Sequence, residues 1–132
     1  MKDLTDAWGA SYYEFLDGSS YLYSTRFLGK QKNTAMCSIH PSFTVLDKTK
    51  FVDEVAPRLS QMTKKESLCL WYGWTMTEDG TKAFCREAYK NGKGVAKHLE
   101  NVGKVLGEAL DAGILKLDNF EIHGPKEELD QC

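Results

Sequence analysis

Several features that mark membrane, secreted or nucleic-acid-binding proteins are missing from this chain of 132 residues. It has no apolar run of about 18 residues, the length at which a membrane-spanning helix becomes a candidate. Residues 1–6 are followed by aromatic residues and a Gly-Ser turn instead of the apolar region of a signal peptide. The 17 Lys and Arg residues are scattered among 19 Asp and Glu residues, so no basic stripe is available for nucleic acid. We therefore expect a cytoplasmic protein that binds neither membrane nor nucleic acid.

The cysteine pattern argues against two further kinds of site. Cys37, Cys69, Cys85 and Cys132 are far apart in the sequence, with no Cys-x-x-Cys pair and no His at zinc spacing. We therefore expect neither a structural metal nor a dithiol redox motif. The prediction is four reduced cysteines, of which two lie in strands and Cys132 is exposed.

Residues 1–36 are rich in aromatic side chains. The spacing of Trp8, Tyr12 and Phe15 predicts a helix, whereas the aromatic positions from 21 to 27 alternate as they would in a strand. The polar segment 30–33 is then expected to be a linker. We interpret residues 1–36 as an aromatic-rich extension of a domain that spans residues 37–132.

Local patterns in residues 38–89 predict a strand, a helix and a hairpin. Alternation over 38–45 predicts a strand that tolerates Pro41 near its start or at an edge of the sheet. Asp47 can cap a helix whose apolar face runs from residue 51 to residue 62, with a kink or an early break at Pro57. The runs 68–76 and 82–89 flank an Asp-Gly turn, which predicts a β-hairpin.

A second helix and a last strand complete the pattern. Apolar residues at helical spacing from Val95 to Leu110 predict a helix that ends at Gly113. Residues 114–122 predict a strand with a bulge near Asp118. The order β-α-β-β-α-β is that of an α+β ferredoxin-like fold, with an antiparallel sheet and both helices on one face. The other face carries Trp and Tyr side chains, so we expect a second copy to cover it in a homodimer.

Titratable and aromatic side chains converge where the hairpin meets the second helix. Glu87 and Tyr89 share one face of their strand, and His98 lies beside the apolar stripe of the helix. A charged group is costly to bury unless it is paired, so these positions suggest a function. We predict that Glu87, Tyr89 and His98 are catalytic, with a desolvated Glu87 or a His98 of near-neutral pKa as proton acceptor. The alternatives are structural: His98 hydrogen-bonded to a neighbouring strand, and Glu87 paired with Arg58 or with another base across the dimer.

Five further residues are candidates for substrate binding. Trp71, Tyr72 and Trp74 divide between the two faces of their strand, so only some of them can line an internal apolar cavity. Asn101 lies in the second helix, and His40 lies on the first strand. The competing interpretation is that the aromatic residues form core, that Asn101 lies on the surface and that His40 is structural.

Three segments resemble the antibiotic biosynthesis monooxygenase domain family of the dimeric α+β barrel superfamily. They are the strand Phe84-Cys-Arg-Glu-Ala-Tyr89, the start of the following helix with His98, and the closing Ile122-His-Gly-Pro125. The resemblance covers residues 38 to about 130. For members that are enzymes, it implies oxidation of a phenol or quinol without a cofactor. The enzyme helps to deprotonate the substrate, whose anion then supplies the electron to dioxygen.

Haem-degrading relatives in the same superfamily use an Asn on the first strand, an aromatic residue on the third and a His on the second helix. Tyr89 and His98 are similar to the last two, but the first strand has Ser42 and Thr44 and no Asn. The resemblance therefore implies a cofactor-independent monooxygenase for a phenolic or quinol-type small molecule, with no metal and no cofactor. Two alternatives remain: a non-catalytic homodimer that binds a small molecule or serves a stress response, and a cyclase or isomerase that uses the same cavity.

Overall fold

The computed structural model describes residues 2–14, 21–24, 29–32 and 35–132. Its helices and strands follow the chain in this order: α1 (Lys2–Ala7), β1 (Ser11–Glu14), β2 (Tyr21–Ser24), β3 (Gly29–Lys32), β4 (Cys37–Val45), α2 (Lys48–Lys50), the π-helical turn η1 (Phe51–Val55), α3 (Ala56–Lys64), β5 (Cys69–Met76), β6 (Lys82–Tyr89), α4 (Gly92–Asp111), β7 (Leu115–Gly124) and α5 (Lys126–Leu129).

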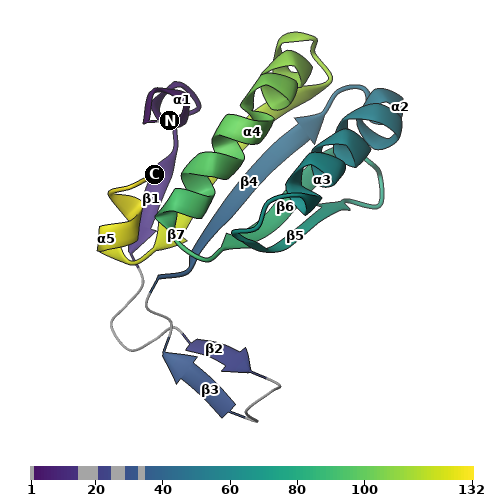
Figure 1. Cartoon of the computed structure of the whole chain (residues 1–132). Coiled ribbons are helices and arrows are strands. Elements are labelled where there is room, and N and C mark those ends of the chain that lie inside the picture. The colour runs from purple at the N-terminus through teal and green to yellow at the C-terminus, as the bar shows by residue number, and fades with distance from the viewer. Residues whose placement is uncertain (1, 15–20, 25–28, 33–34) are drawn as a thin grey trace.

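The main sheet has five strands in the order β1-β7-β4-β6-β5. β4 pairs antiparallel with both β6 and β7, and β5 pairs antiparallel with β6. The helices α3 and α4 lie on one face of this sheet (Figure 1). The predicted α+β ferredoxin-like fold is thus confirmed. β1 adds a parallel strand beside β7, so the sheet is mixed, and β2 and β3 pair antiparallel in a separate two-stranded sheet.

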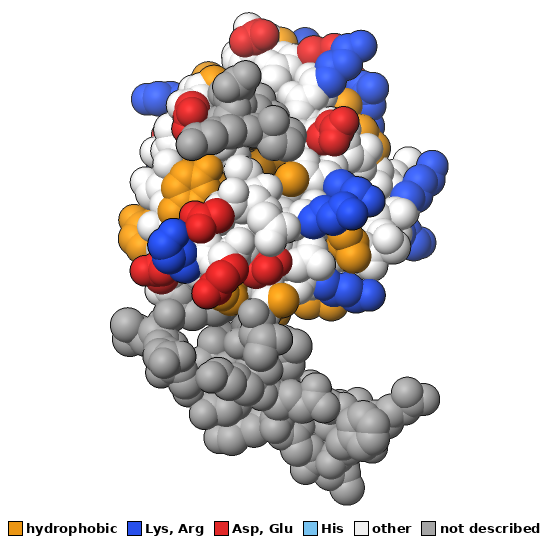
Figure 2. Space-filling view, turned by 60° about the vertical axis from the view of Figure 1, so that its left-hand side comes forward, with side chains coloured by type: hydrophobic (Ala, Val, Ile, Leu, Met, Phe, Trp, Pro, Cys, Tyr) orange, Lys and Arg blue, Asp and Glu red, His pale blue; other side chains and the backbone are white. Residues whose placement is uncertain are grey.

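Alternation along the strands decides which side chains reach the core. In β4 the odd-numbered residues 37–45 are buried and the even-numbered ones are half-buried. The odd-numbered side chains pack under α3 and α4 in two clusters, one around Phe43 and Leu59 and one around Ile39 and Tyr89. We call the face of the sheet opposite α3 and α4 the open face. On the side of the molecule shown in Figure 2, acidic and basic side chains are interspersed, in keeping with the scattered charges of the sequence.

Pro41 occupies an unexpected place. It is the fifth of the nine residues of β4, and β4 is the central strand, so the prediction of a position near the start or at an edge is wrong. The ladder between β4 and β6 pairs Ile39 with Glu87 and Ser42 with Phe84, on either side of Pro41. Pro41 itself lies opposite Phe120 of β7. The sheet therefore accommodates the missing N–H by pairing with β6 before and after this residue.

The helix after β4 begins as predicted but does not break. Asp47 is its N-cap, and its side chain accepts a hydrogen bond from the backbone N–H of Lys50 at 3.1 Å. Pro57 follows the π-helical turn η1 after one intervening residue, and this turn changes the backbone hydrogen-bond pattern just before the residue that has no N–H to donate. A local change of helix type therefore takes the place of the expected kink.

The hairpin, the long helix and the last strand agree with the sequence patterns. Gly80, in the turn between β5 and β6, has a φ of 72°, and Gly113, which follows α4, has a φ of 70°. The register between β4 and β7 shifts between Ser42 and Phe43, which places a bulge at Asp118. Within the described residues, no helix combines the length and the apolar character needed to cross a membrane.

Several expectations for the N-terminal segment and the cysteines need correction. The first helix ends at Ala7, and Tyr12 lies in β1, because residues 11–14 pair with β7 instead of continuing the helix. Residues 30–32 belong to β3 and are not a linker. Positions 15, 25, 27 and 33 lie outside the described residues. Cys132 is buried, with 8% of its surface exposed, because it packs in the cluster around Tyr89. Three cysteines, not two, lie in strands.

Candidate functional site

A buried group of titratable side chains joins β6 to α4. Glu87 and Tyr89 point from β6 toward the helices, and their exposed fractions are 5% and 0%. His98 points inward from α4 and is 3% exposed. Its Nε2 lies 3.0 Å from Oε1 of Glu87, and the Tyr89 hydroxyl donates a hydrogen bond of 2.7 Å to the same oxygen. The structure therefore brings together the three residues that the sequence singled out, while their catalytic role stays a prediction.

A fourth member of this group, Glu66, was missed. It lies in the loop between α3 and β5, where its carboxylate contacts Nδ1 of His98 at 3.0 and 3.1 Å. Asn101 donates a hydrogen bond of 2.7 Å to Glu66 Oε2 and so holds the carboxylate in place. In the sequence Glu66 follows two lysines, a pattern typical of a solvated loop, so no local signal distinguishes it. We call Glu66, Glu87, Tyr89 and His98 the acid–base cluster.

The electrostatics of the cluster favour a charged imidazole. Burial alone would lower the pKa of His98, but the hydrogen bonds to Glu66 and Glu87 and their negative charges outweigh it and raise the pKa from 6.5 to about 9. His98 is thus an imidazolium near neutral pH, not the near-neutral base that the sequence suggested. Both ring nitrogens then donate, each to a carboxylate. Burial, and next the charge of Glu87, raises the pKa of the Tyr89 hydroxyl, so this residue stays a donor.

Aromatic rings of β5 border the cluster. The ring of Tyr72 lies 5.7 Å from that of His98, and Trp74 Nε1 donates a hydrogen bond of 2.8 Å to the Tyr72 hydroxyl. Trp74 also packs against Phe43 and Phe51 at 5.6 and 5.3 Å between ring centroids. Two of the predicted substrate-binding residues therefore lie beside the cluster, where their rings occupy part of the space that the sequence assigned to a cavity.

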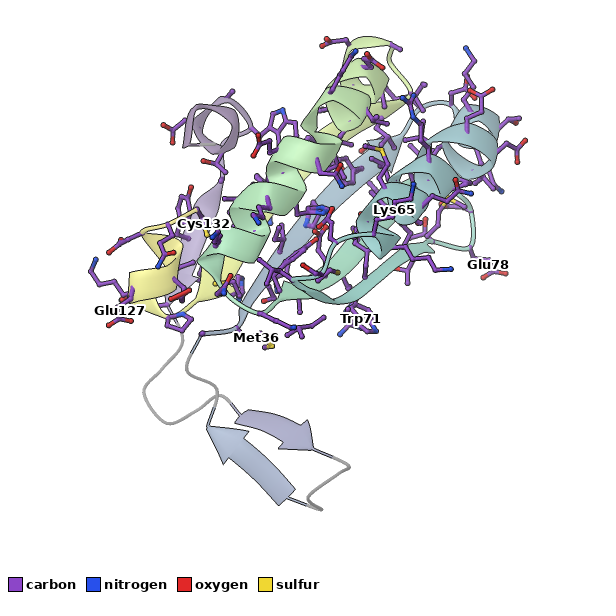
Figure 3. All side chains as sticks on the ribbon, in the orientation of Figure 1. Met36, Lys65, Trp71, Glu78, Glu127 and Cys132 are labelled. Carbon is purple, nitrogen blue, oxygen red and sulfur yellow. The ribbon has the colours of Figure 1, made fainter. Side chains whose placement is uncertain are left out.

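Trp71 and His40 lie elsewhere. Trp71 is 52% exposed, stacks over Arg86 and projects away from the helices (Figure 3). His40 lies on the open face, with its ring 4.5 Å from that of His123 and its Nε2 2.8 Å from the Ser38 hydroxyl. Burial, and next the neighbouring His123, lowers the pKa of His40. Neither residue joins the acid–base cluster, because the strands direct them to the opposite face.

Two hollows reach the cluster, and both are bordered by Glu66. The larger has a volume of about 470 Å³ and the other about 280 Å³. The larger, which we call the Arg58 hollow, is lined by Arg58, Gln61, Met62, Lys65, Glu66 and Asn101. The second, which we call the Tyr72 hollow, is lined by Ser60, Thr63, Lys64, Glu66, Cys69, Leu70, Trp71 and Tyr72. Glu66 is thus the member of the cluster that a molecule in either hollow can contact.

The arrangement is suited to proton transfer. The imidazolium of His98 is an acid, and two carboxylates beside it are acceptors, all in a region where burial strengthens electrostatic interactions. Among the described residues, no group of three or more His, Cys, Asp or Glu side chains is arranged to hold a metal ion.

Comparison with known proteins identifies structural relatives. MupZ from Pseudomonas fluorescens is 30% identical, with a TM-score of 0.65 over 74% of this chain and 78% of its own. SnoaB, a cofactor-independent oxygenase from Streptomyces nogalater, is 12% identical, with a TM-score of 0.57 over 67% of this chain and 91% of its own. A Deinococcus radiodurans protein, provisionally assigned as an antibiotic biosynthesis monooxygenase, is 17% identical, with a TM-score of 0.53 over 65% and 86% of the two chains. The sequence matches no protein-family model and no curated protein.

Proposed function

This chain belongs to the antibiotic biosynthesis monooxygenase-like family of the dimeric α+β barrel superfamily, and from that premise we propose that it is a cofactor-independent monooxygenase. Its substrate would be a phenolic or quinol-type aromatic small molecule. The observation that supports this function is the acid–base cluster, in which His98 lies 3.0 Å from carboxylate oxygens of both Glu66 and Glu87. SnoaB, a neighbour of the same fold, is itself described as a cofactor-independent oxygenase.

The proposed chemistry starts with loss of the phenol proton. A phenol or quinol that enters one of the two hollows meets Glu66, whose carboxylate accepts the hydroxyl proton. The imidazolium of His98 lies behind Glu66 and is hydrogen-bonded to it, so its positive charge favours the substrate anion without touching it. The substrate anion then reduces dioxygen: one oxygen atom forms a new C–O bond on the ring, and the other leaves as water with two hydrogens from the substrate. The substrate supplies all four electrons and is released as a quinone, so no cofactor is needed. Glu87 and Tyr89 act through His98, because they hold its ring in place and keep it protonated.

Oxygen consumption tests this proposal. Purified protein is mixed with a panel of simple quinols, and oxygen uptake and incorporation of labelled dioxygen are measured. We expect Glu66→Gln and His98→Gln to lower kcat by about 100-fold or more, the usual contribution of a general acid or base. Glu78→Gln, in the exposed turn between β5 and β6, is the matched control and should leave kcat unchanged. Full turnover by folded Glu66→Gln and His98→Gln variants would refute the role of the acid–base cluster, and no oxygen-dependent turnover by the wild type would refute the oxygenase.

A second candidate is a cyclase or isomerase at the same cluster. The observation that favours it is the coexistence of an acid, the imidazolium of His98, with carboxylate bases, which is what a proton-moving enzyme needs without any oxidant. Turnover of the same substrates at equal rates with and without oxygen would favour the cyclase or isomerase. Binding of a substrate without turnover under either condition would select the non-catalytic binding protein.

We also propose a homodimer formed through the open face. Three large side chains on this side of the sheet or at its edges are exposed: Tyr13 by 47%, Trp71 by 52% and Phe84 by 41%. The ring of Tyr13 lies 4.7 Å from that of His123, which places Tyr13 on this face. A second copy would bury these rings against their equivalents.

A further inference from the structure

Two basic side chains in the lining of the Arg58 hollow have no role in the proposed chemistry. Arg58 and Lys65 both line it, and within the described residues neither forms an ion pair. Lys65 lies just beyond the end of α3, beside the loop that carries Glu66 (Figure 3). Two cations thus lie at the rim of a hollow that ends on the acid–base cluster.

The carboxylate of Glu66, which also lines this hollow, already has hydrogen-bond partners within the protein. Its two oxygens contact His98 Nδ1, and Asn101 donates to Oε2 at 2.7 Å and to the Met62 carbonyl at 3.3 Å. The cluster as a whole has two carboxylates for one imidazolium, which leaves one net negative charge. Arg58 also lines a neighbouring hollow together with Glu54 and Glu108, so these two carboxylates belong to its surroundings as well. The lining of the Arg58 hollow itself contains two cations and one carboxylate that already has partners, which favours an anionic group on a bound molecule.

We propose that the Arg58 hollow binds a carboxylate of the substrate, so that the substrate is a phenol or quinol that also bears an acidic side chain. This inference rests on the proposed function, because it places the aromatic ring of the same substrate at Glu66. The planar guanidinium of Arg58 is suited to bidentate contact with a carboxylate, and the side-chain amide of Gln61 lies in the same lining. A volume of about 470 Å³ lies within the range of small-molecule sites.

Binding of matched ligands tests the inference without requiring turnover. Calorimetric titration compares 2,5-dihydroxyphenylacetate with its methyl ester, which has the same ring and no charge. We expect the acid to bind about tenfold tighter, as one charge-assisted hydrogen-bonded contact supplies. Arg58→Gln should abolish this preference, and about 0.5 M salt should reduce it. Lys116→Gln, an exposed lysine of β7, is the control and should keep it.

The possible outcomes distinguish failure of the carboxylate site from failure of the proposed oxygenase activity. Equal binding of acid and ester, or an unchanged preference in Arg58→Gln, overturns the carboxylate site, and oxygen uptake with the ester would then leave the proposed function standing. An Arg58-dependent preference without oxygen uptake supports the site and refutes the oxygenase. Tighter binding of 4-hydroxyphenyl phosphate than of the carboxylate also overturns the inference, because the hollow would then be a phosphate site.

Discussion

His98 is the residue on which the candidate site depends. It is 3% exposed and contacts a carboxylate through each ring nitrogen, so its charge is stable only while both partners are in place. The sequence predicted His98, Glu87 and Tyr89, because they fall at core positions of elements with clear periodicity. It did not predict Glu66, since a charged loop residue becomes part of the interior only when α4 packs over it.

The protonation of His98 makes the stability of the protein depend on pH. Its pKa is 6.5 in the unfolded chain and about 9 in the folded one, so the folded state holds the proton more tightly. The resulting stabilisation is complete below pH 6.5 and is lost as pH rises through about 9. We expect the free energy of unfolding, measured by urea denaturation, to fall by about 2 kcal/mol between about pH 6 and 8.5.

A substitution at the same position isolates this effect. His98→Gln should remove most of the decline with pH, whereas His123→Gln, on the open face, should retain it. A wild-type free energy of unfolding that is flat over the same pH range would show that His98 is not held as an imidazolium.

At the scale of helices and strands, sequence patterns predicted the elements that depend on interactions between residues close together in the sequence. The hairpin of β5 and β6, the helix α4 and the bulge in β7 were all predicted, because periodicity and turn residues specify them. The pairing of β1 with β7 was not, since it joins Ser11 to Glu121 and leaves no local pattern. Pro41 was placed wrongly for a similar reason: which strand becomes central depends on the topology. The boundary between extension and domain at residue 37 stays a prediction, although β4 begins there.

Two glycines of α4 should respond in opposite directions to alanine. A Cβ at Gly92 would clash with the backbone carbonyl oxygen of Glu128, where the start of α4 meets α5, and backbone cannot easily move aside. We expect Gly92→Ala to destabilise the protein by about 2 kcal/mol or more. A Cβ at Gly107 has no atom within 4 Å, so Gly107→Ala should stabilise the helix by about 0.5–1 kcal/mol. Urea denaturation measures both, and changes of the same sign would contradict the close packing of α4 and α5.

At the scale of the whole molecule, the two faces of the sheet are unequal. One is covered by α3 and α4 (Figure 1). The other carries half-buried polar side chains among exposed rings. On this open face His40, Ser38 and His123 form a polar contact group of their own, with His123 paired to Glu121 at 3.0 Å. The acid–base cluster lies on the covered side. The proposed catalytic chemistry and the proposed dimer contact therefore use different faces of one sheet.

The dimer proposal can be tested with two substitutions of equal exposure. Phe84 on the open face is 41% exposed, and Val52 on the helix side is 42% exposed. In a homodimer joined through the open face, Phe84→Asp would bury two unpaired carboxylates, so we expect the dissociation constant to rise by about 100-fold or more. Val52→Asp should leave it unchanged. Sedimentation at several concentrations gives both values, with circular dichroism to verify folding. A monomeric wild type, or equal dissociation of the two variants, would exclude the open face as the interface.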